Sequence, residues 1–239
     1  MSDDIRIKPA GDSALVVEFE ERIDPAVSAR VLELDRAVVA AALPGVLETL
    51  PTYRTLLLRF DPLASDPAAI AAAVAKLAAA ARGDAKPGRI WRIPVAYGGA
   101  LGEDLADVAA AKGLAPEDVI ALHRGSIYHV YMLGFVPGYA YLGGLDPRLH
   151  HSRRVNPRLK VPAGTVGIGG QQAGIQSIEA PSGWHLLGRT PARLFDMRRA
   201  DPFLLKPGER VRFVPISATD FERLDALAEK GEIVAEVES

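Results

Sequence analysis

The sequence predicts a small α+β domain over residues 1–84, a mainly-β domain over residues 89–216 and a helical tail over residues 217–239. In the first part, apolar stripes with helical spacing alternate with short β-forming runs, as expected for helices on one face of an antiparallel sheet. Beyond residue 89, most apolar runs are short and are separated by turns rich in glycine and proline. That pattern is typical of a β-barrel or sandwich.

The first domain should begin with two short strands between residues 5 and 20. Two helices then open in the same way, with an aspartate N-cap before a proline at the first helical position, at Asp24-Pro25 and Asp66-Pro67. Residues 46–50 and 55–60 between them are predicted to form a hairpin. No catalytic constellation occurs in this domain, so a packing or assembly role is the simpler interpretation.

A polar linker over residues 82–88, with a turn at Pro87-Gly88, is the expected domain boundary. The second domain should open with a strand over residues 89–97 and two helices over residues 103–112 and 116–123. A strand rich in aromatic and β-branched residues and a glycine-rich aromatic loop should follow at residues 127–133 and 134–144. The remaining short strands are expected at residue 161 and residues 165–168, 185–187, 193–195, 203–205 and 211–214, and the tail helix at residues 220–230.

Composition excludes several classes of protein. The 239 residues include no cysteine, which removes disulfides, thiolate nucleophiles and sulfur-ligated metal sites. The net charge of −2 gives no global basis for binding nucleic acid or a membrane surface. The N-terminal residues are acidic, and no run of about 18 apolar residues occurs, so neither a secretory signal nor a membrane span is expected. A cytoplasmic location is favoured.

The stretch from residue 154 to residue 190 is expected to carry function. It combines a dense framework of glycine and proline with three arginines, Arg154, Arg158 and Arg189. Glycine and proline stand where the backbone turns sharply or where something approaches it closely. Guanidinium groups suit carboxylate or phosphate oxygens. The glycines could form a backbone nest for a phosphate or supply the curvature of a barrel corner, and both interpretations stay open.

Standard catalytic motifs are absent from the sequence. It has no Walker phosphate loop, no dinucleotide fingerprint and no G-x-S-x-G nucleophile elbow. The five histidines lack metal-site spacing, so no metal ligand is assigned. His123 should lie on the last turn of a helix, where the dipole favours a cation. The residues alone indicate a cleft with arginines and aromatic rings, suited to a small anionic ligand.

Four motifs together resemble the allophanate hydrolase subunit 1 family, which includes Kip-type inhibitors of a histidine kinase. They are GFVPGYAYLG from Gly134, RRVNPR from Arg153, VPAGTVGI from Val161 and GWHLLGRT from Gly183, and the pair Gly174-Ile175 matches as well. The resemblance is strong over residues 89–215, and the order of elements before them is consistent with it. It implies that the second domain is a cyclophilin-like β-barrel, and a urea-carboxylase domain shares the same signature.

The resemblance also implies an activity. Family members include the B subunit of ATP-dependent 5-oxoprolinase, which acts with subunits A and C to open 5-oxo-L-proline to L-glutamate. ATP is therefore the expected cofactor, bound by this chain or shared with a partner, and a role for magnesium is left open. The chain is expected to be inactive alone. The alternatives are a Kip-type inhibitor of a sensor histidine kinase, or the equivalent subunit of a urea- or allophanate-metabolising enzyme.

Position by position, the resemblance assigns Arg154, Arg158 and Arg189 to the substrate carboxylate or the phosphate, as catalytic residues. Seven more residues match the framework of the family's cleft and are assigned to substrate binding: Phe135, Pro137, Gly164, Gln172, Gly174, Gly183 and Trp184. The sequence departs from the family pattern at Tyr139-Ala140, Thr165, Gln176-Ser177 and Ser182, where Phe-Pro, Ser, Tyr-Pro and Gly are common.

Overall fold

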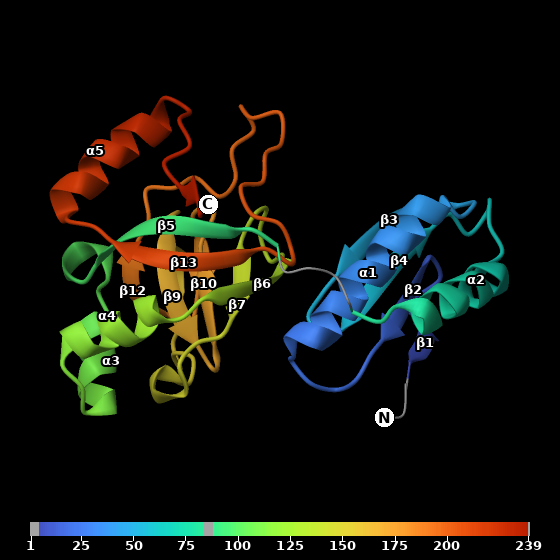
Figure 1. Cartoon of the computed structure of the whole chain (residues 1–239), viewed down its shortest axis with the longest axis horizontal. Helices are drawn as coiled ribbons and strands as arrows, with labels where there is room; N and C mark the ends of the chain where they lie inside the picture. The colour runs from blue at the N-terminus through green and yellow to red at the C-terminus, as the bar shows by residue number, and fades with distance from the viewer. Residues whose placement is uncertain (1–4, 84–87, 239) are drawn as a thin grey trace. The chain divides into compact units, whose positions relative to one another are not determined.

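The computed structural model describes residues 5–83 and 88–238, and the chain groups into two compact units, Met1–Lys86 and Pro87–Ser239 (Figure 1). Residues 84–87 of the predicted linker and residues 1–4 of the acidic N-terminal segment lie outside the described residues. Within the described part of the chain, no helix combines the length and apolar character needed to cross a membrane. The cytoplasmic location stays a prediction.

The first unit contains a four-stranded antiparallel sheet in the order β1-β2-β4-β3 and two helices. The Asp24 carboxylate accepts a hydrogen bond from the Ala26 N–H at 2.8 Å, and Asp66 accepts one from the Ala68 N–H at 2.9 Å. Both predicted N-caps are therefore confirmed. The elements are β1 (Arg6–Pro9), β2 (Ala14–Glu18), α1 (Pro25–Ala41), β3 (Val46–Pro51), β4 (Thr55–Phe60) and α2 (Pro67–Ala80).

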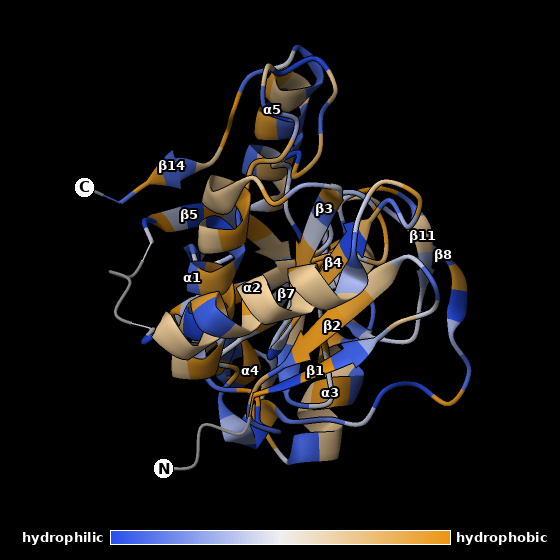
Figure 2. Ribbon diagram, turned by 90° about the vertical axis from the view of Figure 1, so that its right-hand side faces the viewer, coloured by the Kyte–Doolittle hydropathy of each residue, from blue (hydrophilic) through white to orange (hydrophobic). Residues whose placement is uncertain are grey.

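The core of the first unit forms where the apolar sides of these elements meet. The stripe predicted for α1 is buried except at its last member, Ala41, which is exposed, and Leu34 at its centre is fully inaccessible. Val74 of α2 and Leu58 of β4 are also fully buried, in the same cluster. In Figure 2 the ribbon of β2 is hydrophobic over most of its length. Helix periodicity therefore identified most, though not all, of the buried helix residues of this unit.

The second unit is built on a mixed sheet in the order β12-β9-β10-β7-β6-β13-β5-β14. An additional pairing of β12 with β5 closes seven of these strands into a barrel, which fits the cyclophilin-like barrel implied by the resemblance. The strands are β5 (Ile90–Tyr97), β6 (Tyr128–Leu133), β7 (Ala140–Gly143), β9 (Thr165–Gly169), β10 (Gln172–Ile175), β12 (His185–Arg189), β13 (Arg210–Pro215) and β14 (Glu236–Val237).

Shorter elements flank the barrel. Strands β8 (Arg158–Val161) and β11 (Ala180–Ser182) form a separate two-stranded sheet. Helices α3 and α4 lie side by side next to the barrel, and α5 belongs to the tail (Figure 1). The remaining bounds are η1 (Gly99–Leu101), α3 (Leu105–Lys112), α4 (Pro116–Gly125), η2 (Pro147–Leu149) and α5 (Ala218–Glu229).

Two predicted strands, at residues 193–195 and 203–205, are wrong. The two segments meet through a single isolated bridge between Phe195 and Phe203. The Arg199 side chain donates hydrogen bonds to the Arg193 carbonyl at 2.8 Å and to the Pro202 carbonyl at 3.0 Å. The Pro202 carbonyl also accepts from the Asp196 N–H at 2.9 Å, so the arginine side chain supplements a short backbone pairing that does not extend into a strand ladder.

His123 also differs from its expected role as a cation at a helix end. It is fully buried in α4, where its ring stacks on Phe213 with centroids 4.7 Å apart. Its Nδ1 lies 2.8 Å from the Tyr97 hydroxyl. Burial lowers the pKa of His123 to about 3, so the ring is neutral near pH 7.

Candidate functional site

An open hollow of about 240 Å³ lies on the second unit, among the residues that carry the family resemblance. Its walls come from the loop between β6 and β7, the segment before β8, and the turn from β11 into β12. Aromatic rings and arginines dominate the lining, as the sequence suggests. The lining residues are Phe135, Tyr139, Tyr141, Arg153, Arg154, Pro157, Pro181, Ser182, Gly183 and Trp184.

One wall of the hollow is a cluster of aromatic rings. Tyr139 meets Phe135 and Trp184 edge-on, each with ring centroids 6.0 Å apart, and its centroid lies 4.7 Å from that of Tyr141. A side chain at Gly174 would collide with the Tyr139 hydroxyl and the Trp184 ring. The glycine of β10 therefore makes room for this wall, which is a concrete role for one predicted framework residue.

Phe135 stands out because the residue is 63% exposed and its backbone has a φ of 66°. A bulky residue without glycine's freedom pays a conformational cost in this left-handed region. Such strain persists where the surrounding structure enforces it, and it often occurs at binding sites. Phe135 thus presents an apolar face to the hollow from a constrained position.

Asp104, which the sequence analysis did not identify, holds two of the three predicted arginines. Arg158 donates to both of its carboxylate oxygens at 2.9 and 2.7 Å, and Arg154 Nη1 donates to Oδ1 at 3.1 Å. The Leu186 N–H donates to Oδ2 at 2.8 Å. Asp104 is 2% exposed and precedes α3 without capping it through its side chain. An acid at a helix start normally suggests an N-cap, so no local signal marked this role.

The electrostatics of Asp104 follow from these contacts. Burial would raise the pKa of the Asp104 carboxyl, but the hydrogen bonds from Arg158 and from the Leu186 N–H outweigh it. The charges of Arg158 and Arg154 act in the same direction as these hydrogen bonds, and the pKa falls below its usual range. Asp104 is therefore an anion that orients the two guanidinium groups.

The three predicted arginines occupy different positions. Arg154 lines the hollow, and its buried Nε–H has no hydrogen-bond partner among the described residues. Arg158 is paired with Asp104 and with Glu103, whose Oε2 lies 3.4 Å away, and is not part of the lining. Arg189 donates from Nε to the Ala163 carbonyl at 2.8 Å and lies outside the lining too. The structure thus brings Arg154, and not the other two, to the aromatic wall.

A second arginine of the hollow is Arg153, the first residue of the RRVNPR motif. Its guanidinium lies over the Trp184 ring, 5.7 Å from the centroid. Arg153 and Arg154 therefore both present positive charge to the aromatic wall. The double arginine was visible in the sequence, but only the fold shows that both members face the same space.

The other predicted framework residues divide into two groups. Gly183 and Trp184 line the hollow with Phe135. Outside the lining, the Pro137 carbonyl accepts from the Ser177 hydroxyl at 2.6 Å, and the Gly164 N–H donates to the Gln176 carbonyl at 2.7 Å. Gln172 begins β10 opposite Gly169 of β9. The substrate-binding assignments of these residues stay predictions.

A narrow space of about 10 Å³ adjoins the hollow, because Tyr139, Ser182 and Trp184 line both. Its lining also includes Thr165 and Gln176, whose side chains donate to nearby carbonyls. Four positions where the sequence departs from the family pattern therefore surround one space. The departures are scattered along the chain and are brought together by β9, β10 and the turn before β12.

No group of three or more His, Asp or Glu side chains suited to a metal ion occurs within residues 5–83 and 88–238. The polar groups facing the hollow are instead cationic or hydroxylic. The arrangement can bind an anion through Arg153 and Arg154 and can pack a small ring or apolar group on the aromatic wall.

Comparison with known proteins places this geometry in a family. Residues 5–205 match the model described as carboxyltransferase domain, subdomain C and D. The chain is 37% identical to the B subunit of 5-oxoprolinase from Bacillus subtilis, over 90% of this chain and 95% of that protein. It is 43% identical to the B subunit of 5-oxoprolinase from Escherichia coli O157:H7, over 86% of this chain and 93% of that protein.

Solved structures agree at the level of fold. The crystal structure of TTHA0988 matches with a TM-score of 0.77 and 36% identity over 86% of this chain. This chain spans 40% of the length of that one. The Kluyveromyces lactis urea amidolyase matches with a TM-score of 0.81 at 22% identity, covering 98% of this chain and 16% of that one. At that identity, the likeness concerns the fold alone.

Proposed function

This chain belongs to the family described as carboxyltransferase domain, subdomain C and D, and we propose that it is the B subunit of an ATP-dependent 5-oxoprolinase. The observation that carries the proposal is its match to proteins of that name along nearly their whole length. The proposed reaction opens the lactam of 5-oxo-L-proline to L-glutamate with hydrolysis of ATP. Subunits A and C are the proposed partners, and the chain alone is expected to be inactive.

The hollow suits the proposed substrate. 5-Oxo-L-proline combines a small ring with a carboxylate, and the hollow combines an aromatic wall with Arg153 and Arg154. Arg154 lines the hollow, so its guanidinium group can donate to a carboxylate or phosphate oxygen there. We assign Arg154 to direct contact with the anion. Phe135 and Trp184 are assigned to packing on the ring.

The same donors fit an oxygen of ATP, on this chain or at a site shared with the C subunit. When bound, ATP would supply the phosphoryl group that makes the unreactive lactam oxygen a leaving group. Fixed cations at the hollow would stabilise the charge that develops there. Magnesium bound with ATP needs only one or two carboxylates besides the phosphates, and the proposal leaves its ligands unassigned.

Arg158 and Arg189 enter the proposal in different roles. Arg158 fixes the Asp104 carboxylate that in turn orients Arg154, so it is a positioning residue. Arg189 donates to the Ala163 carbonyl beside Gly164, so it stabilises the turn before β9. Its guanidinium carbon also lies 5.7 Å from the centroid of the Phe221 ring in α5. The α+β arrangement of the first unit is proposed to be a separate domain used in packing or assembly.

The test is glutamate release from 5-oxo-L-proline and ATP by the complete complex with subunits A and C. Arg154→Gln should lower kcat/KM by about 10- to 100-fold, since a charge-assisted hydrogen bond contributes about 1.5–3 kcal/mol. Arg148→Gln is the matched control, because Arg148 is exposed and pairs with Asp146. It should retain wild-type turnover.

Three results would contradict the proposal in different ways. Wild-type turnover of the Arg154→Gln complex would remove Arg154 from the site. A complete complex inert on 5-oxo-L-proline but active on urea or allophanate would support the enzyme alternative. An inert complex, together with a chain that binds a sensor histidine kinase and slows its autophosphorylation, would support the inhibitor alternative.

A further inference from the structure

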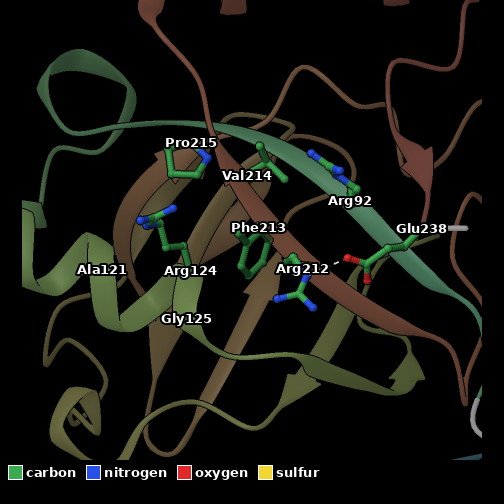
Figure 3. A pocket seen from close by; sticks show the side chains of 9 residues that line it. All are labelled: Arg92, Ala121, Arg124, Gly125, Arg212, Phe213, Val214, Pro215 and Glu238. Carbon is green, nitrogen blue, oxygen red and sulfur yellow. Dashed lines mark ion pairs between the residues drawn. The ribbon is translucent and has the colours of Figure 1, made fainter.

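A second hollow, of about 540 Å³, lies elsewhere on the second unit and shares no lining residue with the first (Figure 3). It is formed by β5, the end of α4, β13 and the segment that continues from β14. The lining residues are Arg92, Ala121, Arg124, Gly125, Arg212, Phe213, Val214, Pro215 and Glu238. None of them belongs to the site proposed above.

Three arginines reach this hollow from three elements. Arg92 of β5 and Arg212 of β13 are register partners in a parallel pair, so their side chains leave the sheet on the same face. Adjacent strands lie about 4.8 Å apart, and like charges directly opposite each other are unfavourable. Arg124 extends from the last turn of α4, across Phe213 from Arg212 in Figure 3. The fold thus brings arginine side chains close together, and their mutual repulsion must be offset by nearby negative charge.

Within the described residues, carboxylates neutralise the charge of these arginines only in part. The Arg212 Nε lies 3.2 Å from Glu238 Oε1, yet its buried N–H is not aligned for a hydrogen bond and has no other partner there. Arg92 and Arg124 have no side-chain hydrogen bond or ion pair with any described residue. Glu236, the cross-strand partner of Arg92 on β14, adds a second carboxylate on the same face, so three guanidinium groups and two carboxylates leave one positive charge at the hollow.

We propose that this hollow binds a compact anion of the phosphate class. A single group with several oxygens can accept from guanidinium groups on adjacent strands at one level. Carboxylates spaced along an extended peptide chain are about 7 Å apart on one face, which suits this arrangement less well. The volume of the hollow lies within the range of small-molecule sites.

Glu238 acts in this arrangement as an internal competitor. Its carboxylate approaches Arg212 from the segment after β14, which pairs with β5 through Glu236 opposite Arg92. An incoming anion shares or displaces that contact. Removing the Glu238 charge therefore leaves the three arginines to the ligand and strengthens binding.

The experiment is isothermal titration calorimetry of the full chain with inorganic pyrophosphate at low ionic strength. The wild type should bind, and Arg92→Gln and Arg212→Gln should each weaken binding about tenfold or more, as expected for loss of a charge-assisted bond. Glu238→Gln should bind several-fold more tightly. Arg223→Gln is the charge-matched control in the same unit, since Arg223 is exposed and pairs with Asp220 on α5. It should bind like the wild type.

The outcomes separate the possible sources of the anion. Tighter binding of ATP than of pyrophosphate would identify a nucleotide, and equal binding would identify the phosphate group alone. Either result supports the proposal. No pyrophosphate binding by folded wild type would overturn it, as would equal weakening in the Arg223→Gln control or weaker binding by Glu238→Gln. Loss of an acidic protein partner in Arg92→Gln, without pyrophosphate binding by the wild type, would assign the hollow to a protein interface instead.

Discussion

At the scale of single residues, Asp104 organises the candidate site more than any of the arginines in the glycine-rich stretch. Its carboxylate receives hydrogen bonds from Arg154, Arg158 and the Leu186 N–H. It links the start of α3, the segment before β8, and β12, which are far apart in the sequence. The arginines were recognisable as candidates by type, whereas their common partner became visible only in the fold.

Replacing Asp104 should therefore destabilise the second unit. Asp104→Asn keeps the shape of the side chain but leaves two guanidinium groups without their shared anion. We expect a loss of about 3 kcal/mol in the free energy of unfolding, at the low end of the range for breaking a buried ion pair because both arginines are partly exposed. Urea unfolding, monitored by tryptophan fluorescence, measures this loss of stability. Asp107→Asn, on the first turn of α3, is the control, and an equal loss there would contradict the prediction.

The same carboxylate predicts a pH dependence. The pKa of Asp104 in the folded protein lies below its ordinary value of 3.8, so the unfolded state binds the proton first. Its contribution to stability is therefore fully present well above pH 3.8 and is lost as the pH falls through the folded-state pKa. The stability difference between wild type and Asp104→Asn should be constant near neutral pH and should narrow in acid. A difference that widens in acid would show the sign to be wrong.

At the scale of elements, the helices of the first unit were predictable because their signals are local. An aspartate cap followed by proline defines each start, and one apolar stripe defines the buried side. The strands of the barrel were harder to predict. The short strands β7 and β10 lie in glycine-rich sequence, and the segments around Phe195 and Phe203 look like strands without forming them. Whether a short apolar segment becomes a strand depends on a partner distant in sequence.

The two N-caps give a prediction at this scale. Asp66→Ala should lower the free energy of unfolding of the first unit by about 1 kcal/mol, because the Ala68 N–H loses its acceptor. Asp66→Asn should have little effect, since asparagine caps equally well. The free energies of unfolding of the two variants are compared by urea unfolding, monitored by far-ultraviolet circular dichroism. Equal destabilisation by both substitutions would indicate that the charge, rather than the cap, is what matters.

At the scale of the whole molecule, each unit has its own hydrophobic cluster, and the two clusters share no residue. Both tryptophans of the chain, Trp91 and Trp184, belong to the second unit. Tryptophan fluorescence therefore reports on the second unit, whereas circular dichroism reports on both. This difference allows the proposed domain organisation to be tested without cutting the chain.

Leu34→Ala should remove a fully buried side chain from the first unit at a cost of about 2–5 kcal/mol. The circular dichroism transition in urea should acquire an earlier component, and the fluorescence transition should stay in place. Leu187→Ala is the reciprocal variant, because Leu187 is fully buried in the barrel core. It should move the fluorescence transition. A shift of fluorescence by Leu34→Ala would mean that the two units unfold together.

The helices of the first unit, the mainly-β character of the second and the stretch that carries the family resemblance could all be identified without coordinates. These features rest on caps, periodicity and composition, which act within a few residues. The folded chain was needed to show that Arg154 faces the aromatic wall with Arg153, that Arg158 is held by Asp104, and that Arg92 and Arg212 are neighbours on β5 and β13. Barrel closure sets these neighbours, because strand pairing joins residues far apart in the sequence, and the pattern of one strand alone does not identify its partner.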